Sequence, residues 1–242
     1  MQLSSLPFLI VIIFGFLLFL TQRLYRLGRL KTAQRNWIGV LLGILLCWGG
    51  ISGCLSSSGV YVAQAFLDLA PGYWLPYVPV VIAMTLVMTV RPLRQGLRIL
   101  VDDTPVHWLI GIHQLRILAL GSIIKASNGL FPQKFAWYVG IPDLMFGITA
   151  MLVSLLLLRR GRFSDWFLIP WHLLGAMVIV IPATGLMHVY MQEPLFSELL
   201  AFPMALAPTL VVPTFVMLNL LVVWRLAEHK LNRSSDIEPR SE

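Results

Sequence analysis

The fold is decided by residues 107–150, which read HWLIGIHQLRILALGSIIKASNGLFPQKFAWYVGIPDLMFGITA. Two apolar segments flank a short loop, and each is close to the roughly 20 residues that cross a bilayer as a helix. One formal charge lies inside each segment, Arg116 in the first and Asp143 in the second. We therefore expect two membrane-spanning helices joined by a tight turn, with the chemistry of the protein between them.

The rest of the chain has the same apolar character. Of its 242 residues, 58% are hydrophobic and only 12% are charged, and the mean hydropathy is +0.81. A soluble domain carries about twice this share of charged residues. We predict an all-α, polytopic bundle of seven transmembrane helices over residues 1–225, followed by a polar tail at 226–242.

The apolar runs locate the spans of this bundle. No Lys or Arg precedes the first run, and no small-residue cleavage site follows it, so we expect this run to be kept as the first span. The runs predict seven spans, at about residues 4–22, 37–55, 74–90, 107–125, 137–158, 166–188 and 200–224.

The basic residues predict the orientation of these spans. Fifteen of the 18 Lys and Arg residues follow the first, third, fifth and seventh spans. Loops on the cytoplasmic side of a membrane are rich in Lys and Arg, so the N-terminus is expected outside and the C-terminus in the cytoplasm of a bacterial inner membrane. The net charge of +7 then reflects contact with anionic lipid headgroups. The bilayer is the expected partner, and no nucleic acid is predicted.

Arg116 and Asp143 are the candidate functional pair. A charge deep in a bilayer is costly, so it normally faces the bundle interior and has a partner. Asp143 shares a narrow helical face with Gly140, Gly147 and Ala150, and small residues of this kind let another helix approach closely. The pair could bind a small polar or anionic ligand, relay protons, or simply fix the packing of the two spans.

Four further residues are candidates because they neighbour this pair in the sequence or flank it. His113 lies one turn before Arg116, and Gln114 follows it, so both could orient a ligand by hydrogen bonds. Lys125 and Asn128 would lie near the outer mouth of a cavity, where Lys125 could attract an anion or only reach toward the interface.

A haem is a third hypothesis for the histidines. His113 and His172 are expected at similar depth in different spans, and two such histidines ligate haem in membrane cytochromes. Hydrogen-bonded or interfacial histidines are the alternative. No spacing of Cys and His resembles a zinc site, so we predict no metal site of that kind and assign no cofactor.

The sequence offers no catalytic motif. H-E-x-x-H, G-x-S-x-G and the Walker A pattern do not occur, so no catalytic residue is predicted, and an enzyme is not the favoured reading. Cys47 and Cys54 are about 10 Å apart along one predicted helix, which is too far for a disulfide between them.

The hairpin resembles a group of uncharacterised bacterial seven-span membrane proteins. The resemblance covers the spans at 107–125 and 137–158 and implies that this hairpin is the shared feature, without implying an activity. Position 113 is an amide in many of those proteins, so His113 departs from them, which weakens the haem hypothesis. The matching positions are Gln114-x-Arg116, Gly129-x-x-Pro132-x-x-Phe135-Ala136, Gly140-x-x-Asp143 and Gly147.

The sequence therefore leaves three hypotheses. The first is a transporter-like or receptor-like protein that binds a small ligand or moves protons around Arg116 and Asp143. The second is a structural or accessory membrane subunit in which the two charges only hold helices together. The third is a haem-binding redox protein.

Overall fold

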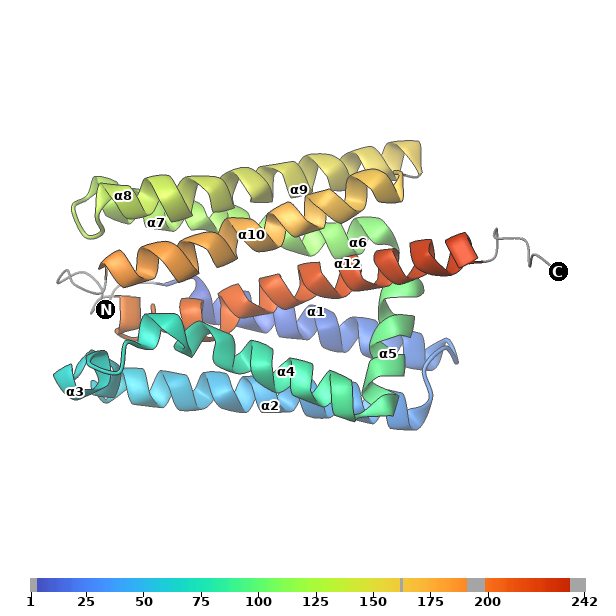
Figure 1. Ribbon diagram of the computed structural model, residues 1–242, viewed down its shortest axis with the longest axis horizontal. Helices are drawn as coiled ribbons and strands as arrows, with labels where there is room; N and C mark the ends of the chain where they lie inside the picture. Colours follow the sequence, from blue (N-terminus) through green and yellow to red (C-terminus); the bar gives the residue numbers. More distant parts are fainter. Residues whose placement is uncertain (1–3, 162, 191–198, 236–242) are drawn as a thin grey trace.

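The computed structural model describes residues 4–161, 163–190 and 199–235, of which 165, 182–190 and 233–235 are described by their backbone only. Every element in this part of the chain is a helix. The longer helices lie side by side along one direction, as Figure 1 shows. The main helices are α1 (Leu6–Arg26), α2 (Thr32–Ser57), α4 (Val78–Thr89), α5 (Arg91–Asp102), α6 (Val106–Gly111), α7 (Leu120–Ser127), α9 (Ile141–Arg160), α10 (Asp165–Tyr190) and α12 (Val212–Ser235).

Shorter helical turns complete several of the long segments. A 3₁₀ segment joins α6 to α7, and a π-helical segment precedes each of α9 and α12. The short elements are η1 (Val60–Val62), α3 (Gln64–Leu67), η2 (Pro71–Tyr73), η3 (Leu75–Tyr77), η4 (Ile112–Ala119), α8 (Gln133–Phe135), η5 (Ala136–Gly140) and η6 (Ala207–Val211).

Six helical segments are long and apolar enough to cross a membrane, which makes the chain a multi-pass membrane protein. The helix α10 contributes a shorter apolar stretch, Trp166–Ile181, within the described side chains. The six segments are Leu6–Arg26, Thr32–Ser57, Pro71–Thr89, Val106–Ser127, Gln133–Arg160 and Ala207–Asn232. The last helix continues to Ser235, ten residues beyond the predicted end of the bundle at 225; residues 236–242 of the predicted tail lie outside the described part.

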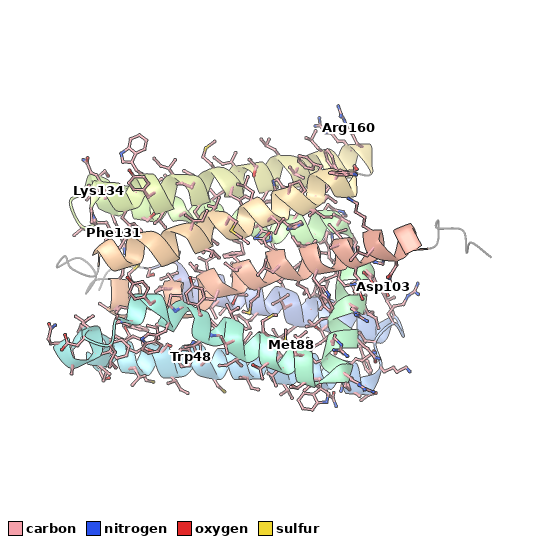
Figure 2. All side chains as sticks on the ribbon, viewed as in Figure 1. Trp48, Met88, Asp103, Phe131, Lys134 and Arg160 are labelled. Atoms are coloured by element: carbon pink, nitrogen blue, oxygen red, sulfur yellow. The ribbon has the colours of Figure 1, made fainter. Side chains whose placement is uncertain are left out.

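The helices form two groups with α12 between them. In Figure 1, α6, α7, α9 and α10 lie on one side of α12, and α1, α2 and α4 lie on the other. The connection from α9 to α10 and the helix α5 lie at the same end of the bundle, and Figure 2 places Arg160 and Asp103 there, with Lys134 at the opposite end. The basic connections therefore gather at one end.

The predicted spans end at residue 90 and resume at 107, which leaves residues 91–106 as a connecting loop, but most of this connection is helical. It forms the amphipathic helix α5, which runs across the ends of the other helices (Figure 1). Leu93, Leu97 and Leu100 are buried on one face. Gly96 lets this face approach α2, since a Cβ added there would lie 3.1 Å from the Ile38 side chain. Three arginines lower the hydropathy of α5, but their spacing leaves the opposite face apolar.

An ionic network anchors α12 to α5 at the same end. Arg225 Nη2 lies 2.5 Å from Asp102 Oδ2, and Arg98 Nη2 lies 2.5 Å from Glu228 Oε1. His229 Nε2 is also 3.1 Å from Asp102 Oδ1. Two charged residues of α5 are thus paired with the last turns of α12.

Proline chemistry explains a further contact of α12. Pro213 has no N–H to donate, so the carbonyl of Thr209, four residues earlier, has no helical donor at this position. Trp48 of α2 donates its Nε1–H to this carbonyl at 2.9 Å. This bond joins α2 to η6, which leads into α12.

Candidate functional site

Arg116 and Asp143 form a direct ion pair between η4 and α9. Arg116 donates from Nε to Asp143 Oδ1 at 2.5 Å, and its Nη2 lies 2.5 Å from the same oxygen. The Arg116 side chain is 0% exposed, whereas that of Asp143 is 22% exposed. The two charges that the sequence singled out therefore meet without a bridging group.

Arg116 has further contacts with the two helices that flank the pair. Its Nη1 donates to the carbonyl of Gly175 in α10 at 2.8 Å. Its guanidinium carbon lies 4.2 Å from the centre of the Phe146 ring in α9, a distance suited to a cation–π contact. Gly175 permits this arrangement, since a Cβ there would lie 2.2 Å from the Phe146 ring.

Small residues bring η4 and α9 together, as predicted. A Cβ added to Gly147 of α9 would lie 2.6 Å from the backbone nitrogen of Ile117 in η4. In the adjoining segments, one added to Gly140 of η5 would lie 2.7 Å from Ser122 Oγ of α7. Ala150 on the same face is fully buried. The backbones of the two segments are therefore in contact beside the ion pair.

The 3₁₀ geometry of η4 explains why His113 and Arg116 share a face. Residues three apart are eclipsed in a 3₁₀ helix, which has three residues per turn. His113 and Arg116 are accordingly both buried, at 0% and 2% exposure. A 3₁₀ stretch in the middle of a helix often marks a functional hinge or a sequence under strain.

His113 is enclosed by aromatic rings and by a second histidine. Its ring centre lies 5.8 Å from that of Phe146, 6.1 Å from Trp171, 5.9 Å from His172 and 5.6 Å from Phe215. The structure thus brings the two histidines of different helices into contact. We call His113, Arg116, Asp143, Trp171 and His172 the buried polar cluster.

His172 is oriented by Asn219 of α12. Asn219 Nδ2 donates to the carbonyl of Phe215 at 3.2 Å, so its Oδ1 is the acceptor for His172 Nδ1 at 2.8 Å. A neutral imidazole that donates from Nδ1 keeps Nε2 as an acceptor. Asn219 is fully buried. The sequence reading did not use it, although a lone amide inside an apolar span signals a polar contact.

Several buried polar atoms of the cluster lack a protein partner. Within the described residues, no hydrogen bond is made by either ring nitrogen of His113, by His172 Nε2 or by Trp171 Nε1. Buried polar groups are satisfied in the great majority of cases, and each one left unsatisfied costs about 1–3 kcal/mol. The cluster therefore offers both donors and acceptors to a small guest.

The other predicted residues lie away from this cluster. Gln114 is only partly buried and makes no side-chain hydrogen bond within the described part of the chain. Lys125 lies about 14 Å further along the helix at 1.5 Å per residue, with Nζ 3.1 Å from Met204 Sδ and 5.3 Å from the Phe131 ring. Asn128 is exposed at the end of α7. The structure does not join these three residues to Arg116.

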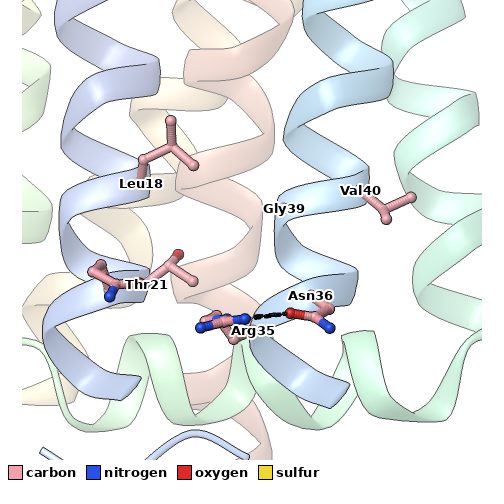
Figure 3. Close-up of a pocket in the computed structure, with 7 residues that line it drawn as sticks. Leu18, Thr21, Arg35, Asn36, Gly39 and Val40 are labelled. Carbon is pink, nitrogen blue, oxygen red and sulfur yellow. Dashed lines mark hydrogen bonds between the residues drawn. The ribbon is translucent and has the colours of Figure 1, made fainter. Parts of the chain in front are cut away.

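A groove between α1 and α2 is a separate feature. Its volume is about 410 Å³, and Figure 3 shows Thr21 and Arg35 on its walls. Arg35 donates from Nη2 to Asn36 at 2.9 Å, and Thr21 donates to the carbonyl of Leu17 at 2.8 Å. Thr21 and Arg35 therefore already have hydrogen-bond partners, whereas buried polar atoms of the cluster have none within the described residues. The groove is the weaker candidate for a ligand site.

The side chains that usually bind metal ions do not gather at one place in the described part of the chain. Within the described residues, no set of three or more His, Cys, Asp and Glu side chains could hold a metal ion. Cys47 and Cys54 are both exposed and free.

Comparison with known proteins places the chain in a family. No curated protein and no solved structure matches it. Residues 72–227 match the model of a family described as Domain of unknown function (DUF8737). The match covers more than half of the chain and contains the whole buried polar cluster together with Asn219. The chain therefore belongs to this family of unknown function.

Proposed function

We propose that the protein binds a small polar ligand in the buried polar cluster, with transfer of a proton as part of binding. The observation that carries this proposal is the set of unpartnered ring nitrogens on His113, His172 and Trp171, next to the Arg116–Asp143 pair. Such atoms suit a guest that both donates and accepts hydrogen bonds.

The charge balance of the cluster narrows the ligand class. Arg116 is already neutralised by Asp143 at 2.5 Å, so an anion would compete with the carboxylate for the same guanidinium. If Asp143 takes up a proton, Arg116 is free to hold an anion. A small acid, bound as an anion plus a proton, is therefore the favoured guest, and transport or sensing of such a molecule is the proposed role.

We further infer seven spans in a bacterial inner membrane, with the N-terminus outside and the C-terminus in the cytoplasm. The support is that the basic connections gather at one end of the bundle (Figure 2), which is the cytoplasmic end by the positive-inside rule. In this arrangement α10 is the additional span.

A structural or accessory role is the second candidate. It is favoured by the fact that Arg116 is enclosed by Asp143, Gly175 and Phe146, which suits a pair that locks three segments together. This role predicts that exchanging the charges, as Arg116→Asp with Asp143→Arg, restores the thermal stability that each single change removes.

The haem hypothesis has the least support. His113 and His172 do approach each other, but Phe146, Trp171 and Phe215 pack against the His113 ring with centres 5.6–6.1 Å away. A macrocycle between the two imidazoles would have to displace these rings. A visible spectrum of the purified protein would show a Soret band if haem were bound.

Native mass spectrometry of the protein, solubilised under mild conditions, tests the leading proposal. His113→Phe removes two unpartnered nitrogens and keeps a ring of similar size, so the variant should fold. His107→Phe is the matched control, since His107 lies at the start of the same span. We expect a bound small molecule on the wild type and on His107→Phe, and at least tenfold less on His113→Phe. Equal occupancy in all three proteins would contradict the proposal.

A further inference from the structure

Besides the groove between α1 and α2, the structure has a larger cavity, which lies on the other side of α12 from the buried polar cluster. Its volume is about 600 Å³, within the range of ligand pockets. The walls come from α1, α2, α4, α5 and α12 and are mostly aliphatic and Met side chains; Figure 2 labels Met88 on the α4 wall. Met84 and Met88 of the lining are exposed, so the cavity opens to the surface of the bundle, and its apolar walls suit an apolar guest.

Two arginines of α5 line this cavity but differ in their pairing. Arg98 is held by Glu228 at 2.5 Å and lies over the Trp224 ring at 5.2 Å. Arg94 makes no ion pair within the described residues and is only partly buried. A cation without a counter-charge therefore stands where an apolar cavity meets the basic end of the bundle.

We propose that this cavity binds one acyl chain of an anionic phospholipid, with the lipid phosphate held by Arg94. An apolar cavity of this kind does not favour water, and hydrocarbon is the surrounding solvent of the bundle. Basic pockets between transmembrane helices at the cytoplasmic side bind anionic lipid headgroups. The apolar walls thus match the acyl chain of such a lipid, and the guanidinium of Arg94 matches its phosphate.

Lipid-dependent melting of the full-length protein in neutral detergent tests this site. Phosphatidylglycerol and phosphatidylcholine with identical chains are titrated separately, and inorganic phosphate is titrated as the free anion. We expect phosphatidylglycerol to raise the melting temperature at lower concentration than phosphatidylcholine, and phosphate to have no effect. Loss of one interfacial arginine weakens such binding about fivefold, so Arg94→Gln should raise the half-maximal phosphatidylglycerol concentration by that factor.

Two matched controls locate the effect. Arg91→Gln removes an exposed charge from the same helix outside the cavity and should leave the response unchanged. Ala83→Phe fills the cavity and should abolish the response to both lipids, whereas Val81→Phe, at a position 61% exposed on the same helix, should not. If Ala83→Phe does not fold, Arg94→Gln alone decides the test.

Three outcomes would overturn the proposal. Equal responses of the wild type to the two lipids would show that Arg94 selects no headgroup. A half-maximal phosphatidylglycerol concentration that is the same in Arg94→Gln and in the wild type would show that Arg94 does not hold the lipid phosphate. A rise in melting temperature with phosphate alone, as large as with lipid, would indicate a free-anion site in place of a lipid site.

Discussion

Asp143→Asn is predicted to destabilise the protein by leaving Arg116 without a counter-charge. The arginine side chain is 0% exposed, and its Nε donates a hydrogen bond to Asp143. Asparagine has nearly the same shape as aspartate and can still accept one hydrogen bond. The substitution therefore removes the negative charge with little change in packing.

The size of this effect follows from the burial of the pair. Removing one partner of a buried ion pair costs about 3–5 kcal/mol. Asp143 is 22% exposed, and Arg116 keeps its bond to the carbonyl of Gly175, so the lower end, about 3 kcal/mol, is expected. In a chain of this size, that loss lowers the melting temperature by about 6–12 °C.

Thermal unfolding in one detergent, followed by far-ultraviolet circular dichroism, measures the loss. Asp68→Asn is the matched control, because Asp68 is exposed and its one side-chain bond within the described residues is to Gln64, at 2.8 Å. Its effect should stay within about 0.5 kcal/mol. Adding Arg116→Gln to Asp143→Asn should recover part of the loss, since no unpaired charge remains. A melting temperature for Asp143→Asn equal to that of Asp68→Asn would refute the reasoning.

Three further predictions use the same melting assay. Gly147→Ala should cost about 1–3 kcal/mol, because the new Cβ would lie 2.6 Å from a facing backbone nitrogen, whereas Gly43→Ala, with open space around it, should cost nothing; equal effects would contradict the close approach. Burial alone would raise the pKa of Asp102, but hydrogen bonds from the arginine and histidine of α12 hold it below its usual value. The stability that this carboxylate contributes is therefore complete above its unfolded pKa of about 3.9 and is lost as the pH falls through the lower folded value. In the wild type, the melting temperature should fall with the pH in this acidic range, and Asp102→Asn should reduce that fall. The same dependence of melting temperature on pH in Asp102→Asn would show that Asp102 is not its cause. Asn219→Leu should cost about 1–3 kcal/mol by removing the only hydrogen-bond partner found for His172 in the described residues, and a neutral effect would show that the ring is held by packing alone.

The partner of Arg116 and the close approach beside it could be predicted because each has a local signal. A charge within an apolar segment needs a partner, and Asp143 is the one carboxylate inside a predicted span. The sequence places the two residues at different depths, so it predicts the partner but not the direct contact. Gly140 and Gly147 recur at helical spacing with Asp143, so the narrow face was visible in the sequence. These residues predict the close approach of another helix, and the structure shows that η4 is the segment that approaches Gly147.

Other parts of the fold and of the site depend on information that is not local. The helix α5 was missed because Arg91, Arg94 and Arg98 lower its mean hydropathy, although the leucines between them repeat at helical spacing. The contact between the Phe146 ring and Gly175 depends on how α9 packs against α10. The spacing of residues along one segment does not determine this packing.

The hydrogen bonding of His113 in the membrane is the most direct test of a functional cluster. Nitrogen-15 NMR of histidine-labelled protein in lipid reports whether each imidazole nitrogen has a partner, and His113→Phe assigns the signal. No protein group within the described residues reaches these nitrogens, so their partner would be a bound molecule, a water or a group outside the described part; a signal that changes when the protein is washed free of small molecules identifies the first. The account predicts a hydrogen-bonded His113 ring in protein taken directly from the membrane. Chemical shifts of an unbonded imidazole would contradict it and would favour a purely structural ion pair.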